Sequence, residues 1–116
     1  MTKRKKDYSQ KNSVYFKKLP QIVAALKKGY KPEKIILFGS MLDDKVKSHD
    51  IDLFLVKNGV EKFDRRERYD QVSRLLSHDV PMDILVYTPY EVKKRLYLGD
   101  PFVKTIVNGG KLLYGS

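Results

Sequence analysis

The sequence has no cysteine and no long apolar run. The 116-residue chain therefore forms no disulfide, holds no metal ion through thiolates and has no thiol nucleophile. No apolar stretch approaches the roughly 18 residues that a membrane-spanning helix requires. The charged first residues also lack the apolar segment of a secretory signal. These absences favour one domain with a modest core, located in the reducing cytoplasm and away from membranes.

Positive charge is concentrated at the beginning of the chain, whose net charge is +10. Residues 1–34 carry eleven Lys and Arg against two acids, whereas residues 35–116 carry thirteen against twelve. We predict a flexible basic arm at residues 1–12, ahead of one folded domain at residues 13–116. The arm either binds nucleic acid or an acidic partner, or it only keeps the chain in solution.

Apolar periodicity and turn residues predict a small α/β domain. The first helix is expected to begin after Ser13 and to be interrupted near Pro20. Two later helices begin with capping residues followed by proline, at Thr88 and Asp100. The predicted helices span about 13–28, about 60–77, a segment from 88 onward and a short segment from 100 to 107; the predicted strands span 34–38, 50–56 and 82–87. This order gives a short mixed sheet with helices.

Three aspartates are expected to meet at one edge of this sheet. Asp50 and Asp52 point to the same face, because side chains alternate along a strand. The loop between the first two strands has no helical pattern, which favours an antiparallel pair. A helix connects the second strand to the third, which favours a parallel pair with a right-handed crossover. The strand beginning that carries Asp83 then lies beside Asp50 and Asp52, and the Gly39-Ser40 turn lies at the same edge.

Clustered carboxylates beside a Gly-Ser turn are typical of a metal and phosphate site. Three neighbouring carboxylates repel one another, and Mg²⁺ removes that repulsion because it prefers oxygen ligands. Gly39 lets the backbone approach a ligand, and Ser40 offers a hydroxyl and an N–H group to a phosphate. Each feature alone also occurs in structural turns, and Asp83 alone could cap a helix or pair with an arginine. Their combination in this order is far more specific.

At these residues the chain resembles the minimal nucleotidyltransferases of the DNA polymerase beta superfamily. The matching residues are "LFGS", then nine residues, "DID" and later "PMD", and the closing "DPFVKTIVNGGKLLYG" is similar as well. The resemblance covers roughly residues 20–115. It implies transfer of a nucleoside monophosphate, AMP from ATP or another NTP, to an acceptor hydroxyl with two Mg²⁺ ions.

The resemblance also implies roles for individual residues. Gly39 and Ser40 would hold the triphosphate, and Asp50 and Asp52 would ligate both metal ions. Asp83 would complete the second metal site and help to deprotonate the acceptor.

One loop departs from the pattern of these relatives, many of which read Gly-Ser-x-Ala-Arg-Gly. This chain has "MLDDKVKSH" after the Gly-Ser pair, without Arg or Gly. Lys45 and Lys47 are the candidates for the missing positive charge, and Asp43 and Asp44 oppose them. His49 either contacts a phosphate or is a solvated loop residue.

The resemblance implies a partner protein. Such small transferases often act on a helical HEPN-type partner in a toxin–antitoxin pair, adding AMP to a tyrosine of the partner. A homo-oligomer is another way to complete so small a site. Two alternatives to enzymatic activity remain: a degenerate member that neutralises its partner by contact, and a nucleic-acid-binding module that uses the basic arm.

Two further groups of residues have a structural and a functional interpretation. The helix predicted at 60–77 carries either a solvated charged face with ion pairs such as Asp64–Arg68 and Asp70–Arg74, or a surface that contacts a phosphate or a partner. Tyr87, Tyr97 and Tyr114 either pack against the domain or form a surface for a partner.

Overall fold

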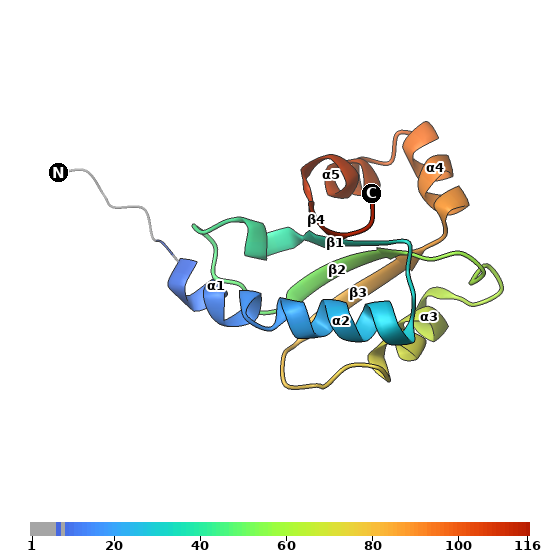
Figure 1. Cartoon of the computed structure of the whole chain (residues 1–116). Coiled ribbons are helices and arrows are strands. Elements are labelled where there is room, and N and C mark those ends of the chain that lie inside the picture. The colour runs from blue at the N-terminus through green and yellow to red at the C-terminus, as the bar shows by residue number, and fades with distance from the viewer. Residues whose placement is uncertain (1–6, 8) are drawn as a thin grey trace.

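A computed structural model describes residues 7 and 9–116 and contains one four-stranded sheet with helices on both faces (Figure 1). The helices are α1 (Ser9–Phe16), α2 (Leu19–Gly29), α3 (Arg65–Ser73), α4 (Pro89–Tyr97) and α5 (Pro101–Gly109), with a short 3₁₀ helix η1 (Gly39–Leu42). The strands are β1 (Lys34–Phe38), β2 (Ile51–Val56), β3 (Met82–Tyr87) and β4 (Lys111–Tyr114).

The sheet is mixed, as predicted, and its strand order is β3-β2-β1-β4. β1 pairs antiparallel with β2 and with β4, and β2 pairs parallel with β3. The α/β fold class and both predicted pairings are therefore confirmed. The prediction missed β4, a four-residue edge strand that follows a glycine pair and has only one half-buried side chain, Leu113. Such a short strand forms because β1 offers it free backbone groups, which no local pattern reveals.

The two faces of the sheet bury separate apolar clusters. Leu53 of β2 and Ile84 of β3 pack with residues of α2 and α3, such as Leu26 and Val72. On the other face, Phe54 packs with α5. Figure 1 shows α2 and α3 on one side of the sheet and α5 on the other, with α4 beside α5. None of the residues of α4 is buried, although α4 packs beside α5.

The N-terminal helix begins earlier than predicted. α1 starts at Ser9 instead of after Ser13, and the expected interruption falls between α1 and α2, with Pro20 in the first turn of α2. Asn12 is completely buried, which ties this turn of helix to the domain. Residues 9–12 of the predicted flexible arm are thus helical, whereas residues 1–6 and 8 lie outside the described residues.

The helix predicted at 60–77 is shorter than expected, and its charged face is only partly solvated. The side chain of Asp64 accepts a hydrogen bond from the Glu67 N–H group and caps α3, so the predicted Asp64–Arg68 pair is wrong. Arg68 instead turns inward and binds both carboxylate oxygens of Glu91, at 2.7 and 3.2 Å. Glu91 and Thr88 form the predicted capping box of α4. No helix among the described residues combines the length and the apolar character that a membrane crossing requires.

Candidate active site

Three strand ends bring the predicted residues to one edge of the sheet. Asp52 of β2 lies directly opposite Asp83 of the parallel strand β3. On its other side Asp52 lies opposite Phe38, the last residue of β1, and Gly39 follows at once. Asp50 comes immediately before β2. The strand pairing therefore gathers Asp52, Asp83 and Gly39, with Asp50 two positions away along the chain.

Both strand aspartates face the side of the sheet on which α5 packs. Side chains alternate along β2, so Asp52 shares a face with Phe54, which packs against α5. Leu53 points to the opposite face, toward α2 and α3. The cover of α5 ends before the edge of the sheet, because Asp83 is exposed and Asp52 is only half-buried. The aspartates are therefore accessible to a ligand from this face.

Burial and mutual repulsion change the acidity of Asp52. The pKa of its carboxyl is raised from 3.8 to about 6, first by burial and then by the negative charges of Asp50 and Asp83. The three carboxylates are thus close enough to interact electrostatically. A cation among them would remove the repulsion and favour the ionised form of Asp52.

The donor set has the chemistry of a magnesium site, but the side chains are not preassembled around one point. Within residues 7 and 9–116, no group of three or more His, Cys, Asp or Glu side chains is placed to hold a metal ion. Carboxylate oxygens are nevertheless the ligands that Mg²⁺ takes in proteins, together with waters and substrate phosphates. A cation held by fewer than three of these side chains would take its remaining ligands from water or from substrate phosphates.

Gly39 occupies a position that no other residue fits. Its φ angle is 83°, in the left-handed region that L side chains rarely adopt. A Cβ atom there would collide with Oδ2 of Asp52. Glycine is required both for the turn after β1 and for the close approach of the backbone to Asp52. The approach of a ligand to this backbone, which the sequence analysis expected of Gly39, stays a prediction.

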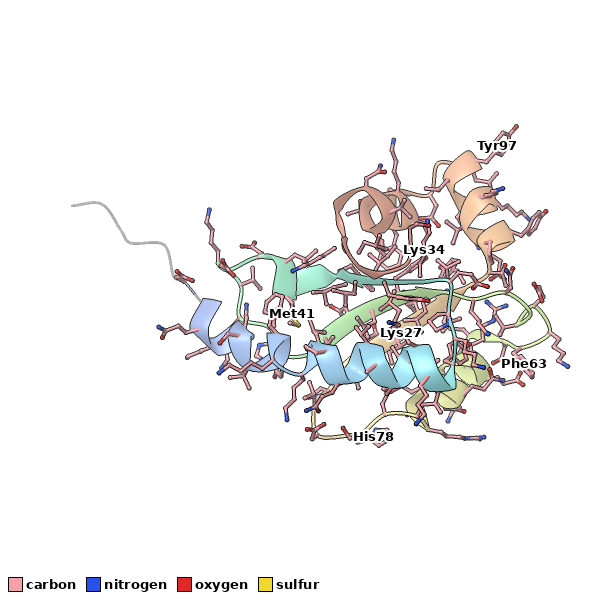
Figure 2. The ribbon with its side chains drawn as sticks, in the orientation of Figure 1. Lys27, Lys34, Met41, Phe63, His78 and Tyr97 are labelled. Carbon is pink, nitrogen blue, oxygen red and sulfur yellow. The ribbon has the colours of Figure 1, made fainter. Side chains whose placement is uncertain are left out.

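Ser40 lies at the start of a loop that its own side chain helps to hold. Its hydroxyl donates a hydrogen bond to Oγ of Ser48, at 3.2 Å. Met41, the next residue, is buried in the cluster shared with α2, and Figure 2 shows it below η1 on the side of α1 and α2. The turn that presents Ser40 is therefore anchored to the core from one face.

The two lysines proposed for phosphate binding lie farther along this loop. Lys45 and Lys47 are exposed, as is His49 beside Asp50. The Lys45 N–H group donates to Oδ1 of Asp43 at 2.9 Å, so this aspartate shapes the loop. Contact of either lysine with a phosphate stays a prediction.

Asn12 is a residue of this region that the sequence analysis missed. Its amide donates to the carbonyl of Val46 at 3.0 Å and accepts from the N–H group of Ser48 at 3.0 Å. One asparagine within a lysine-rich segment carries no pattern that reveals burial, because its partners lie more than thirty positions away in the chain.

An apolar groove of about 410 Å³ borders the Gly-Ser turn on the α5 side. The rings of Phe38 and Phe102 meet edge to face there, with their centroids 5.9 Å apart. The groove is lined by Phe38, Gly39, Leu42, Phe102, Thr105, Ile106, Gly109 and Gly110. A flat apolar group bound in it would lie next to Gly39.

The mixed four-stranded sheet with its helices is that of a polymerase beta-like nucleotidyltransferase fold. Residues 20–116 match the family described as Polymerase beta, Nucleotidyltransferase, and the chain belongs to that family. The structure is also similar to a crystal structure of a Sulfolobus solfataricus protein assigned as a nucleotidyltransferase. That match has a TM-score of 0.57 and 24% identity, covers 81% of this chain and 84% of the other, and supports the fold alone. No curated protein matches the sequence.

The raised pKa of Asp52 predicts that this one carboxyl destabilises the metal-free protein as the pH rises. The folded state keeps the proton up to a pH of about 6, whereas the unfolded chain releases it near 3.8, so stability falls between these values. The full shift corresponds to about 3 kcal/mol, which partial exposure reduces to about 1–2 kcal/mol. Urea unfolding at pH 4 and pH 7 in the presence of a chelator measures this loss. Asp52→Asn should show a smaller loss than the wild type by this amount, and an identical pH dependence would contradict the prediction.

Proposed function

We propose that the protein is a Mg²⁺-dependent nucleotidyltransferase that transfers AMP from ATP to an acceptor hydroxyl. The main support is the placement of Asp52 directly opposite Asp83, next to a glycine that lets the backbone reach the same point. Membership of the family supports the same class of reaction. In this proposal Gly39 and Ser40 hold the triphosphate, and Asp50, Asp52 and Asp83 are the metal ligands.

The reaction follows from the chemistry of these groups. The acceptor oxygen attacks the α-phosphorus, the bond from that phosphorus to the pyrophosphate oxygen breaks, and the acceptor proton passes to the carboxylate of Asp83. Bound Mg²⁺ would supply the positive charge that stabilises the leaving pyrophosphate. The N–H groups of the Gly39-Ser40 turn orient the triphosphate, because the Ser40 hydroxyl gives its one proton to Oγ of Ser48. The adjoining apolar groove has room for a planar part of a substrate.

Lys45 and Lys47 take the place of the arginine found in many relatives. They lie between Ser40 and Asp50, so closure of the loop would bring positive charge toward the phosphates. The carboxylate of Asp43 accepts a hydrogen bond from the Lys45 N–H group and keeps its negative charge, so Asp43 still opposes the two lysines. We expect weaker nucleotide binding than an arginine would give, because lysine binds phosphate as a point charge without a two-pronged contact.

A partner protein is proposed as the acceptor, and the outer face of α4 would be its docking surface. α4 follows the end of β3 opposite to Asp83, so the partner must extend along the sheet to bring its hydroxyl to the aspartates. Tyr90, Lys93, Lys94 and Tyr97 follow the i, i+3, i+4, i+7 spacing of one helix face. Tyr90 is 71% exposed and Tyr97 is 90% exposed, and Figure 2 shows Tyr97 at the outer end of the domain. Exposed tyrosines with lysines favour a partner surface that carries acidic groups. We propose a HEPN-type helical toxin, modified on a tyrosine in the cytoplasm, with this protein as its antitoxin.

A second candidate function is neutralisation by contact alone. It is favoured by the missing Arg-Gly and by the absence, within the described residues, of a preassembled metal site. Self-association instead of a foreign partner also stays a prediction. So does nucleic-acid binding through the basic arm at residues 1–12, of which residues 1–6 and 8 lie outside the described residues.

Transfer of label from α-labelled ATP onto protein tests the proposal. Wild-type protein is incubated with Mg²⁺ in a lysate of the source organism, and the labelled band identifies the acceptor. We expect label with the wild type and none with Asp52→Asn. Asp79→Asn is the matched control, because this exposed aspartate pairs with Lys18 outside the site and its loss should leave labelling unchanged.

Absence of label with every NTP, together with no measurable binding of Mg·ATP, would reject the enzyme. Contact-only neutralisation would then be the better account. Label that persists in Asp52→Asn would show instead that the reaction does not depend on the proposed aspartates.

A further inference from the structure

The one completely buried side chain among residues 10–16 of α1 is polar, although Tyr15 and Phe16 also pack against the core from this helix. Within residues 10–16 of this helix only Asn12 is buried, while Val14 is 57% exposed and Tyr15 and Phe16 are half-buried. Asn12 is 0% exposed. A completely buried polar group is retained in a fold only with its hydrogen bonds made. The hydrogen-bond partners of Asn12 therefore show which part of the domain this helix holds in place.

The amide of Asn12 pairs with the loop between η1 and β2 as a neighbouring strand would. It donates to the Val46 carbonyl and accepts from the Ser48 N–H group, both at 3.0 Å. These two backbone groups belong to residues two apart, and an amide side chain supplies the matching donor and acceptor at once. Alanine, leucine or serine at this position cannot make both hydrogen bonds. Figure 1 shows α1 beside this loop.

The contact reaches the candidate active site through one more side chain. Ser48 is only 4% exposed, and its Oγ accepts the hydrogen bond from the hydroxyl of Ser40. The remainder of the loop is held by short-range contacts, such as the Val46 N–H group on the Asp43 carbonyl. The path from Asn12 through Ser48 to Ser40 thus joins α1 to the residue proposed to hold the triphosphate.

We propose that Asn12 is a positioning residue for the nucleotide-binding loop, an inference that rests on the proposed function. Asn12 fixes Ser48 and so sets the direction of the Ser40 hydroxyl and the path of the chain into Asp50. In the absence of this contact the loop that carries Lys45 and Lys47 would sample many conformations, and binding would have to select one of them. The effect falls on nucleotide affinity and not on the two strand aspartates, whose places β2 and β3 fix.

Asn12→Leu tests the proposal, because leucine has nearly the shape of asparagine and neither of its hydrogen bonds. Thr88→Val is the matched control: Thr88 is also 0% exposed and bonds a backbone N–H group, but it caps α4 beyond the other end of β3. Hydrogen exchange at the Ser48 amide and the affinity for a non-hydrolysable Mg·ATP analogue are measured for both variants and the wild type.

We expect at least about tenfold faster exchange at Ser48 and about tenfold weaker nucleotide binding for Asn12→Leu, the effect of losing two buried hydrogen bonds. Thr88→Val should match the wild type in both. The proposal is overturned if Asn12→Leu leaves both measurements unchanged, or if Thr88→Val weakens binding equally. If the wild type binds no nucleotide, the proposed function fails, and faster Ser48 exchange in Asn12→Leu would still establish that Asn12 orders the loop.

Discussion

Replacing Arg68 with methionine is expected to lower the free energy of unfolding by about 3–4 kcal/mol. Arg68 reaches inward from α3, where its side chain is 8% exposed, and binds a Glu91 that is 37% exposed. It also donates to the backbone carbonyls of Val60, Phe63 and Val86, at 2.9–3.0 Å. Methionine fills the space but removes the charged donor from all four groups. The Val60 carbonyl keeps only the Phe63 N–H group and the Glu91 carboxylate keeps only the Thr88 N–H group, and the lost buried hydrogen bonds are the source of the destabilisation.

Chemical denaturation of Arg68→Met and of Arg74→Met measures this effect against a matched control. Arg74 is exposed at the end of the same helix, so its replacement should change stability by less than about 0.5 kcal/mol. Glu91→Gln should cost less than Arg68→Met, because glutamine keeps an oxygen for the Thr88 N–H group and for one arm of Arg68. Equal stability of Arg68→Met and Arg74→Met would mean that the inward pair contributes nothing.

The partner of Arg68 illustrates what the sequence leaves open. Spacing within α3 favoured pairing with Asp64, one turn earlier, because local neighbours are all that a helical pattern contains. In the folded chain the side chain of Asp64 caps α3. Arg68 instead pairs with Glu91, a capping-box residue of α4 that lies 23 positions later in the chain. Asn12 and the edge strand β4 were missed for the same reason, since each is defined by a partner far along the chain.

The elements that place the site were predictable because their information is local or topological. β1 and β3 have the predicted bounds, since short apolar runs between turn residues set them. The antiparallel and parallel pairings follow from the connections, a loop in one case and a helix in the other. Those pairings place Asp52 beside Asp83. The sequence does not predict the side-chain rotations that would complete a metal site, because those rotations depend on the bound cation and triphosphate.

Gly39→Ala is expected to weaken Mg·ATP binding at least about 100-fold and to lower stability by about 2–3 kcal/mol. Alanine at a φ of 83° is strained whatever space surrounds it. Its methyl group would also meet the carboxylate of Asp52, which must then rotate away from the edge shared with Asp83. The substitution therefore removes the close approach of the backbone and displaces a proposed metal ligand in one step.

Gly59→Ala separates the effect of backbone strain from the effect of the contact with Asp52. Gly59 has the same φ of 83°, but nothing lies within 4 Å of a Cβ built there. It should lose only the backbone strain, about 1–2 kcal/mol, and keep full nucleotide binding and transfer. The difference between the two glycine variants then measures the collision with Asp52 together with the lost approach of the backbone to a ligand. If Gly39→Ala bound Mg·ATP as well as Gly59→Ala does, Asp52 could move freely without harm to the site, and the close packing of turn and carboxylate would be a property of the fold and not of the reaction.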